Sequence, residues 1–213
     1  MKIINSSYEI LIDINSTDIY KHIEKISRTC YKSKAKINKN SSEKLIEQLI
    51  KNGHEAMIEF YDITIKFICS RGVSHELVRH RLCNFAQEST RYCNYSHDKF
   101  GNELTFINPV WRKNITEDPK DFAKEVLWVM FLQKCEKTYF DLLDAGLTAQ
   151  EARGVLPNDL STEINVKANI REWRHILKLR TALAAHPDMR DLMMPLLKEL
   201  QEKLPLLFGD IQC

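Results

Sequence analysis

The sequence RHRLCNFAQESTRY, at residues 79–92, places three arginines and Ser89 within thirteen residues. Lysine outnumbers arginine twenty to eleven in the whole chain, yet residues 71–98 contain four arginines and no lysine. Arginine donates paired, planar hydrogen bonds that suit phosphate or a delocalised oxyanion, whereas lysine is a point charge. The stretch therefore indicates a site for an anionic ligand. The alternative is a structural network in which these arginines pair with buried acids.

The composition is that of an ordinary globular protein. The 213 residues are 44% hydrophobic and 28% charged, and the net charge is only +2. A chain of this length buries roughly 70% of its unfolded surface, so we expect a single domain over residues 1–213. The balanced charge argues against a protein that coats nucleic acid, which would carry a clear basic excess.

Cysteine and glycine usage exclude several kinds of site. The six cysteines form no Cys-x-x-Cys pair, so we expect no structural metal and a reducing, cytoplasmic location. The longest apolar stretch, residues 126–132, is far too short for a membrane span. The six glycines build neither Gly-x-Gly-x-x-Gly nor a Walker loop, so a Rossmann-type fold is disfavoured. Any phosphate would then be held mainly by side chains.

Hydrophobic periodicity predicts strands interspersed with helices. Alternating residues predict strands at 62–69, 104–107 and 163–169, and an edge strand within 1–14. Helices are predicted from Ser41 or Ser42 to near Gly53, from Ser74 to Arg79, and over 119–145, 170–183 and 187–204. The core stripe expected for helix 119–145 is Phe122, Val126, Val129, Met130 and Leu142. Because no regular βαβ rhythm appears, we expect an α+β fold.

A second group of arginines, Arg171, Arg174 and Arg180, lies in the helix predicted at 170–183. At about 100° per residue, one stripe of this helix carries Arg171, His175 and Lys178. Arg180 falls near Trp173 and Leu177 on the apolar stripe, so its charge must be met by a carboxylate or by a ligand. Arg153 begins an apolar run and is likewise expected to point inward.

Three catalytic motifs are only partly matched. His54-Glu55 begins like a zincin His-Glu-x-x-His, but residue 58 is isoleucine. Arg79-His80 is similar to the Arg-His-Gly of histidine phosphatases, but Arg81 replaces the glycine. Cys83 and Cys93 lie near the arginines, yet a nucleophilic thiol needs an activating base or a lowered pKa.

The arginine-rich stretch resembles the signature of flavin-dependent thymidylate synthases. Arg-His-Arg at residues 79–81 is followed, after seven residues, by Ser-x-Arg at residues 89–91. Residues 45–55 resemble the family's helix ending in Gly-His-Glu, and residues 152–157 its Ala-Arg-x-x-Leu-Pro. Residues 169–180 match its Asn-x-Arg element and a later arginine. The resemblance runs from about Arg28 to about Arg190.

The resemblance implies a mostly antiparallel sheet packed with helices, and a cytoplasmic homotetramer whose sites are shared between subunits. It also implies reductive methylation of dUMP to dTMP, with methylenetetrahydrofolate as carbon donor and NADPH reducing through FAD, without a nucleophilic cysteine. The flavin-binding residues would be Arg79, His80, Arg81, Gln87, Asn169, Arg171 and His175. The nucleotide-binding residues would be Glu76, Arg79, Gln87, Glu88, Ser89, Arg91, Arg153 and Arg180. Arg180 would be catalytic, stabilising negative charge on the uracil.

This sequence departs from the family pattern at four positions. Ala56 and Phe60 replace what are often a hydroxyl residue and a second histidine, Glu76 stands where glutamine is frequent, and Cys30 where serine is. Two other functions remain open from the residues alone. One is a phosphatase with His80 as nucleophile, and the other is a nucleic-acid-binding module that uses the arginines on backbone phosphates.

Overall fold

Two long strands carry the alternation predicted from the sequence. In the computed structural model, which describes residues 1–97 and 101–212, β3 spans Asp62–Ser70 and β6 spans Ser161–Asn169. Alternate side chains of both strands are buried, among them Ile63 and Ile65 of β3 and Val166 of β6. β-branched residues at every second position favour a strand with one buried face. The predictions for residues 62–69 and 163–169 are confirmed.

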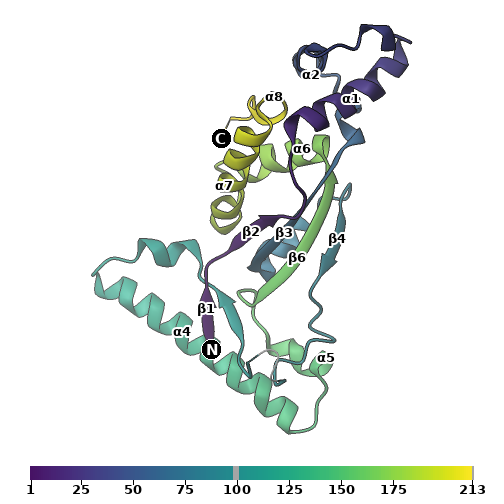
Figure 1. Ribbon diagram of the computed structural model, residues 1–213. Coiled ribbons are helices and arrows are strands. Elements are labelled where there is room, and N and C mark those ends of the chain that lie inside the picture. The colour runs from purple at the N-terminus through teal and green to yellow at the C-terminus, as the bar shows by residue number, and fades with distance from the viewer. Residues whose placement is uncertain (98–100, 213) are drawn as a thin grey trace. The chain divides into compact units, whose positions relative to one another are not determined.

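The strands form two sheets (Figure 1). A four-stranded antiparallel sheet has the order β2-β3-β6-β4, where β2 is Ser7–Ile10 and β4 is Asn84–Gln87. A separate parallel pair joins β1 (Lys2–Ile4) to β5 (Thr105–Ile107). Residues 1–14 therefore contribute strands to two sheets, where a single edge strand was expected. The α+β, non-Rossmann class is confirmed.

Helices make up most of the remaining regular structure. The α-helices are α1 (Ser16–Cys30), α2 (Ser41–Lys51), α3 (Arg71–Leu77), α4 (Pro119–Asp144), α5 (Ala149–Ala152), α6 (Ile170–Arg180), α7 (Pro187–Lys203) and α8 (Pro205–Phe208). Short 3-10 helices are η1 (Lys34–Lys36), η2 (Glu55–Phe60), η4 (Val110–Asn114) and η5 (Arg153–Val155). In the part of the chain that the structure describes, no helix combines the length and apolarity that crossing a bilayer requires.

The chain divides into two compact units, each assembled from stretches that are distant in sequence. The first unit contains residues 1–7, 67–79 and 86–164, and the second contains residues 8–66, 80–85 and those from 165 onward. Strands β3 and β6 contribute residues to both units. The expectation of a single domain over residues 1–213 stays a prediction.

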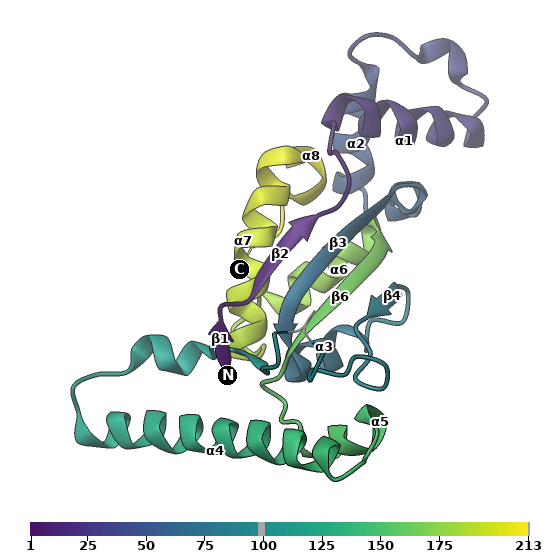
Figure 2. The ribbon, with the colours of Figure 1, turned by 60° about the horizontal axis from the view of Figure 1, so that its bottom comes forward.

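Helices dominate the second unit. α1 and α2 pack against each other, as Figure 2 shows, and α6 contacts both η2 and α7. The apolar face predicted for residues 187–204 is buried in α7: Met189, Leu192, Met193, Leu196 and Leu200. α6 begins directly after β6, because the Asn169 side chain caps it by accepting a hydrogen bond of 2.8 Å from the Glu172 amide. The helix ends at Arg180, three residues before the predicted end.

The first unit is built around α4. Leu132 and Tyr139 of this helix are fully buried against Leu104, Phe106 and Leu160. The stripe predicted for this helix from periodicity is wrong at Phe122, which is 66% exposed, and at Met130, which is 60% exposed, whereas Leu142 does pack against this core. The sequence offers apolar residues on both sides of α4, and only the side carrying Leu132 and Tyr139 meets the core of this unit.

Two predicted helix starts differ in their capping residues. α3 begins at Arg71, before the predicted Ser74, because Ser70 is its cap and accepts a hydrogen bond of 3.2 Å from the Val73 amide. In α2 the residue before the helix is Asn40, and the Ser41 hydroxyl instead donates to the buried Glu24 carboxylate at 3.0 Å. In α2 a tertiary partner therefore engages the serine hydroxyl that was expected to cap the helix.

Candidate functional site

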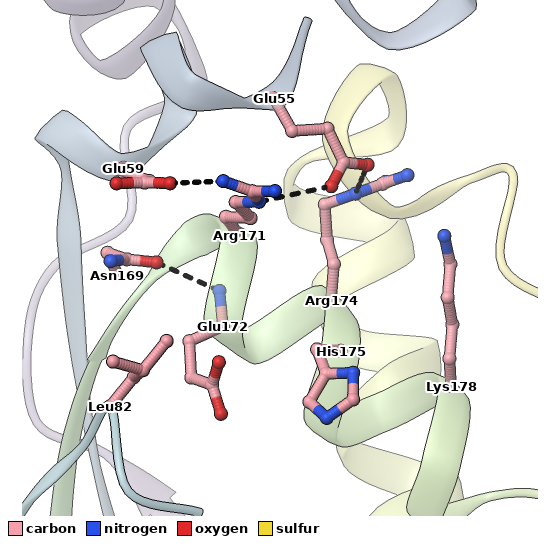
Figure 3. Close-up of a pocket in the computed structure, with 9 residues that line it drawn as sticks. All are labelled: Glu55, Glu59, Leu82, Asn169, Arg171, Glu172, Arg174, His175 and Lys178. Carbon is pink, nitrogen blue, oxygen red and sulfur yellow. Dashed lines mark hydrogen bonds and ion pairs between the residues drawn. The ribbon is translucent and has the colours of Figure 1, made fainter. Parts of the chain in front are cut away.

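A cavity of about 610 Å³ opens in the second unit beside the first turns of α6 (Figure 3). Its lining residues are Glu55, Glu59, Leu82, Asn169, Arg171, Glu172, Arg174, His175 and Lys178. Asn169, Arg171 and His175, which were predicted to contact flavin, therefore lie around one cavity. Its volume is within the range of roughly 300–1,000 Å³ that small-molecule and cofactor sites occupy.

The cavity carries charges of both signs. Arg171 donates to Glu59 at 2.5 Å, and its Nε lies 3.7 Å from Glu55, as Figure 3 shows. The Arg171 side chain is 52% exposed, so a ligand can replace these carboxylate contacts at little cost. Asn169, His175 and Lys178 add polar donors. The lining thus fits a polar, partly anionic group such as a flavin, and it contains no glycine cradle.

Arg174 is a structural arginine. Its side chain is 2% exposed and donates two hydrogen bonds, of 2.6 and 2.7 Å, to the Asp210 carboxylate. It also donates to the Leu207 carbonyl and, at 3.2 Å, to Glu55. The sequence does contain a signal for this burial, because Arg174 lies four residues after Ile170 and three before Leu177 on one apolar stripe. A buried arginine paired with a carboxylate, the arrangement considered for Arg180, is present at Arg174.

Arg180 and His80 are in direct contact within the second unit. The Nε of Arg180 donates to Nε2 of His80 at 3.0 Å, and His80 is 6% exposed. Burial, followed by the charges of Arg180 and His175, lowers the pKa of His80 to about 4. His80 is therefore neutral at physiological pH. Its Nδ1 lies 3.7 Å from the buried Glu172 carboxylate, whose own pKa is raised by burial.

Three of these side chains, those of His80, Glu172 and His175, form the one cluster found in the described part of the chain whose ligand atoms are close enough to bind a metal ion. The ligand atoms of His80, Glu172 and His175 all lie within 4.8 Å of one another. Because Arg180 donates to Nε2 of His80, the lone pair of that nitrogen is already engaged. A cation would have to bind Nδ1 and so reverse the protonation of the ring.

The predicted nucleotide-binding residues of the stretch 87–91 lie in the first unit, several with internal partners. Gln87 donates to Ser74 at 2.9 Å, and the Glu88 carboxylate accepts from the Tyr95 hydroxyl at 2.5 Å. The Ser89 hydroxyl accepts from the Arg91 amide at 3.3 Å, and the Arg91 guanidinium is exposed. Arg91 is therefore exposed and Ser89 is half-buried, whereas Glu88 has a structural contact that the motif did not predict.

The remaining predicted residues are distributed over both units. Arg79 and Arg153 are exposed and Glu76 is partly buried in the first unit, and Arg81 is exposed in the second. The inward orientation expected for Arg153 is wrong, because its position in η5 faces solvent. The first unit contains the predicted site residues Glu76, Arg79, Gln87, Glu88, Ser89, Arg91 and Arg153. The second unit contains His80, Arg81, Asn169, Arg171, His175 and Arg180.

Cys83, whose thiol feels the charge of Glu172, is not activated. Burial, with a smaller contribution from the Glu172 charge, raises the pKa of Cys83 to about 12. Burial also raises the pKa of Cys69 to about 12. Both are therefore protonated at neutral pH, which disfavours a thiolate nucleophile there. Cys213 lies outside the described residues.

Comparison with known proteins agrees with the motifs. The family model described as thymidylate synthase complementing protein matches residues 11–206. A flavin-dependent thymidylate synthase of Corynebacterium aurimucosum is 31% identical over 93% of this chain and 82% of its own length. One of Mycobacteroides abscessus is 30% identical over 88% of this chain and 78% of its own length.

The fold has a counterpart among solved structures. The crystal structure of the UMP/dUMP methylase PolB from Streptomyces cacaoi, bound with 5-Br dUMP, has a TM-score of 0.77 and 21% identity. The match covers 98% of this chain and 96% of the other. With the family match over residues 11–206 and relatives at about 30% identity, the chain belongs to the thymidylate synthase complementing protein family, whose relatives are named flavin-dependent thymidylate synthases.

Proposed function

We propose that this protein methylates dUMP to dTMP, using methylenetetrahydrofolate as carbon donor and NADPH as reductant through FAD. The observation that carries the proposal is the cavity beside α6. Asn169, Arg171 and His175, the residues that the family resemblance assigns to flavin, line it together. Its volume of about 610 Å³ and its polar lining, which carries charges of both signs, suit part of a dinucleotide cofactor.

The overall reaction balances without a cysteine. The methylene carbon of the folate bonds to C5 of uracil, which loses its proton, and one hydride completes the methyl group. Bound FAD, reduced by NADPH, would supply that hydride. The two electrons come from NADPH, and tetrahydrofolate and NADP⁺ are the other products. The raised pKa of Cys83 supports a route in which no thiolate attacks the pyrimidine.

In this proposal the residues of the first unit hold the nucleotide. Exposed guanidinium groups at Arg79, Arg91 and Arg153, with the Ser89 hydroxyl, would bind phosphate, and Glu76 and Gln87 would meet the sugar or the base. Each charge-assisted bond contributes about 1.5–3 kcal/mol. Glu88 would act through its contact with Tyr95.

Arg180 is the proposed catalytic residue. A fixed guanidinium at N3 and O4 of uracil stabilises the negative charge that develops when C5 forms its new bond. Arg180 suits this task because its Nε is already bound by His80, which fixes the guanidinium plane. His80, Arg81, Asn169, Arg171 and His175 would surround the flavin.

The test is a spectrum followed by an assay. The purified protein should show oxidised flavin absorption, and dTMP should form only when dUMP, methylenetetrahydrofolate and NADPH are all present. UMP should be assayed beside dUMP, because the PolB methylase with the same fold is named for both nucleotides. A colourless protein that binds no added FAD would refute the proposal.

The two other functions fit the structure less well. A phosphohistidine at His80 would need an accessible nitrogen, but His80 is 6% exposed and its Nε2 accepts from Arg180. Nucleic-acid binding would require a basic excess that a net charge of +2 does not provide.

We also propose that the chain assembles into a homotetramer with sites shared between subunits. The exposed side of α4 supports self-association, because Phe122, Val126, Leu127, Met130 and Phe131 form an apolar stripe on that helix. Apolar patches of this kind mark interaction surfaces. Sedimentation of the wild type and of Leu127→Glu should give a tetramer and a smaller species, and a monomeric wild type would contradict this.

A further inference from the structure

The contact between Arg180 and His80 fixes the protonation of the imidazole. A guanidinium has only donors, so Nε2 of His80, 3.0 Å from the Arg180 Nε, must carry the lone pair. The ring is neutral at physiological pH because burial, Arg180 and His175 lower its pKa to about 4. The proton of the neutral ring therefore resides on Nδ1.

A carboxylate lies on the Nδ1 side of the ring. The Oε1 atom of Glu172 is 3.7 Å from Nδ1 of His80, longer than a direct hydrogen bond and close enough for strong electrostatic attraction to an N–H. Glu172 is 8% exposed, so solvent screens this attraction weakly. Its backbone amide is fixed by the Asn169 cap, which anchors the residue in the first turn of α6.

We propose that Glu172 is a positioning residue for the catalytic arginine, acting through His80. Its carboxylate favours the tautomer with the proton on Nδ1, which leaves Nε2 as the acceptor for Arg180. Glu172 and Arg180 belong to the same helix, eight residues apart, and His80 comes from the loop before β4. We call this series of contacts, from Glu172 through His80 to Arg180, the relay. All three side chains belong to the second unit.

His80 and Glu172, together with His175, could instead bind a metal, but the hydrogen bond from Arg180 to Nε2 of His80 argues against that. A metal on Nδ1 requires the lone pair there and the proton on Nε2. An Nε2 proton would face the Nε–H of Arg180, two donors with no acceptor between them. With the proton on Nδ1, each ring nitrogen of His80 faces a group of the opposite kind, whereas metal binding at Nδ1 would break the Arg180 contact.

The predicted consequence appears in Glu172→Gln. Glutamine is nearly isosteric, but its amide can present an N–H to Nδ1 and so favour the opposite tautomer, which cannot accept from Arg180. We expect kcat to fall about 10- to 100-fold, as is typical when an outer hydrogen-bonding partner of a functional histidine is removed. The Kd of dUMP should change less than about threefold, and kcat is measured at saturating FAD because Glu172 lines the proposed flavin cavity. Glu47→Gln, which removes an exposed charge from α2, should change nothing.

A double-mutant cycle separates the relay from a general structural effect. In His80→Gln the side-chain amide oxygen reaches about the position of Nε2 and can accept from Arg180 without a tautomer. Glu172→Gln should therefore have little further effect on kcat in the His80→Gln background. An undiminished effect there would overturn the proposal.

The catalytic readout rests on the proposed function, so a second readout is independent of it. In ¹⁵N-histidine spectra of the purified protein, His80 should show protonated Nδ1 and unprotonated Nε2 near pH 7. Glu172→Gln should shift it toward the other tautomer, and His80→Gln identifies its signal. If wild-type protein forms no dTMP but the tautomer shifts, the relay stands and the proposed function fails. An unchanged His80 signal in Glu172→Gln refutes the relay whatever the activity.

Discussion

The lowered pKa of His80 makes a quantitative prediction about stability against pH. An unfolded histidine titrates near its ordinary pKa of 6.5, and folded His80 near about 4. The unfolded chain therefore binds more protons than the folded chain between these values. Stability contributed by neutral His80 is present above pH 6.5 and is lost as the pH falls toward 4.

The magnitude follows from the size of the shift. One pKa unit corresponds to about 1.4 kcal/mol, so the displacement of His80 makes the folded protein about 3 kcal/mol less stable at pH 4 than at pH 7. His80 is 6% exposed, and the loss includes its hydrogen bond from Arg180, which a protonated Nε2 cannot accept.

The assay compares wild type with His80→Gln by urea unfolding at half-unit intervals from pH 4 to 7. Carboxylates away from residue 80 contribute equally to both proteins, so the difference in unfolding free energy reports on residue 80 and its coupling to Glu172. That difference should change by about 3 kcal/mol in favour of the wild type as the pH rises. A direct titration of the His80 ring by NMR should give a midpoint near 4. A flat difference, or a midpoint near 6.5, would refute the reasoning.

Three substitutions test other contacts. Arg180→Ala should retain bound flavin and lower kcat for dTMP formation by about 10²–10³, and normal turnover would remove Arg180 from the mechanism. Arg91→Ala should raise the Kd of dUMP roughly 10- to 150-fold and leave the flavin Kd unchanged, and titrations showing the reverse would discredit the assignment. Asp210→Ala removes two hydrogen bonds from buried Arg174 and should lower the free energy of unfolding by about 1–3 kcal/mol, measured in urea, whereas a neutral result would mean that Glu55 and the Leu207 carbonyl suffice.

Local patterns predicted the elements whose burial they encode. β3, β6 and α7 repeat apolar residues with one clear period, and each lies within two residues of its predicted bounds. The family resemblance predicted that Asn169, Arg171 and His175 share one site, and a single cavity contains all three. The helix alone explains this proximity. Asn169 caps α6, and Arg171 and His175 lie four residues apart in its first turns.

Long-range partners were not predictable from the same patterns. The partner of Arg174 is Asp210, 36 residues away in sequence, and no local signal connects them. Glu172 was likewise missed, because its position at the third residue of α6 is typical of an acid near a helix N-terminus. Its proximity to His80 arises only when the loop at residues 80–83 folds against the helix.

Helix α4 shows why a correct helix prediction can still assign the wrong face to the core. Its sequence has apolar side chains on two sides, and periodicity gives no means of choosing the one that packs within its own unit. The side carrying Leu132 and Tyr139 is buried there, and the side carrying Phe122 and Met130 is exposed. A helix with no need of a partner would have polar residues on that second side, because exposed phenylalanine and methionine add nothing to the stability of a monomer. We therefore propose that the exposed part of the predicted stripe, Phe122, Val126 and Met130, packs between copies of this chain.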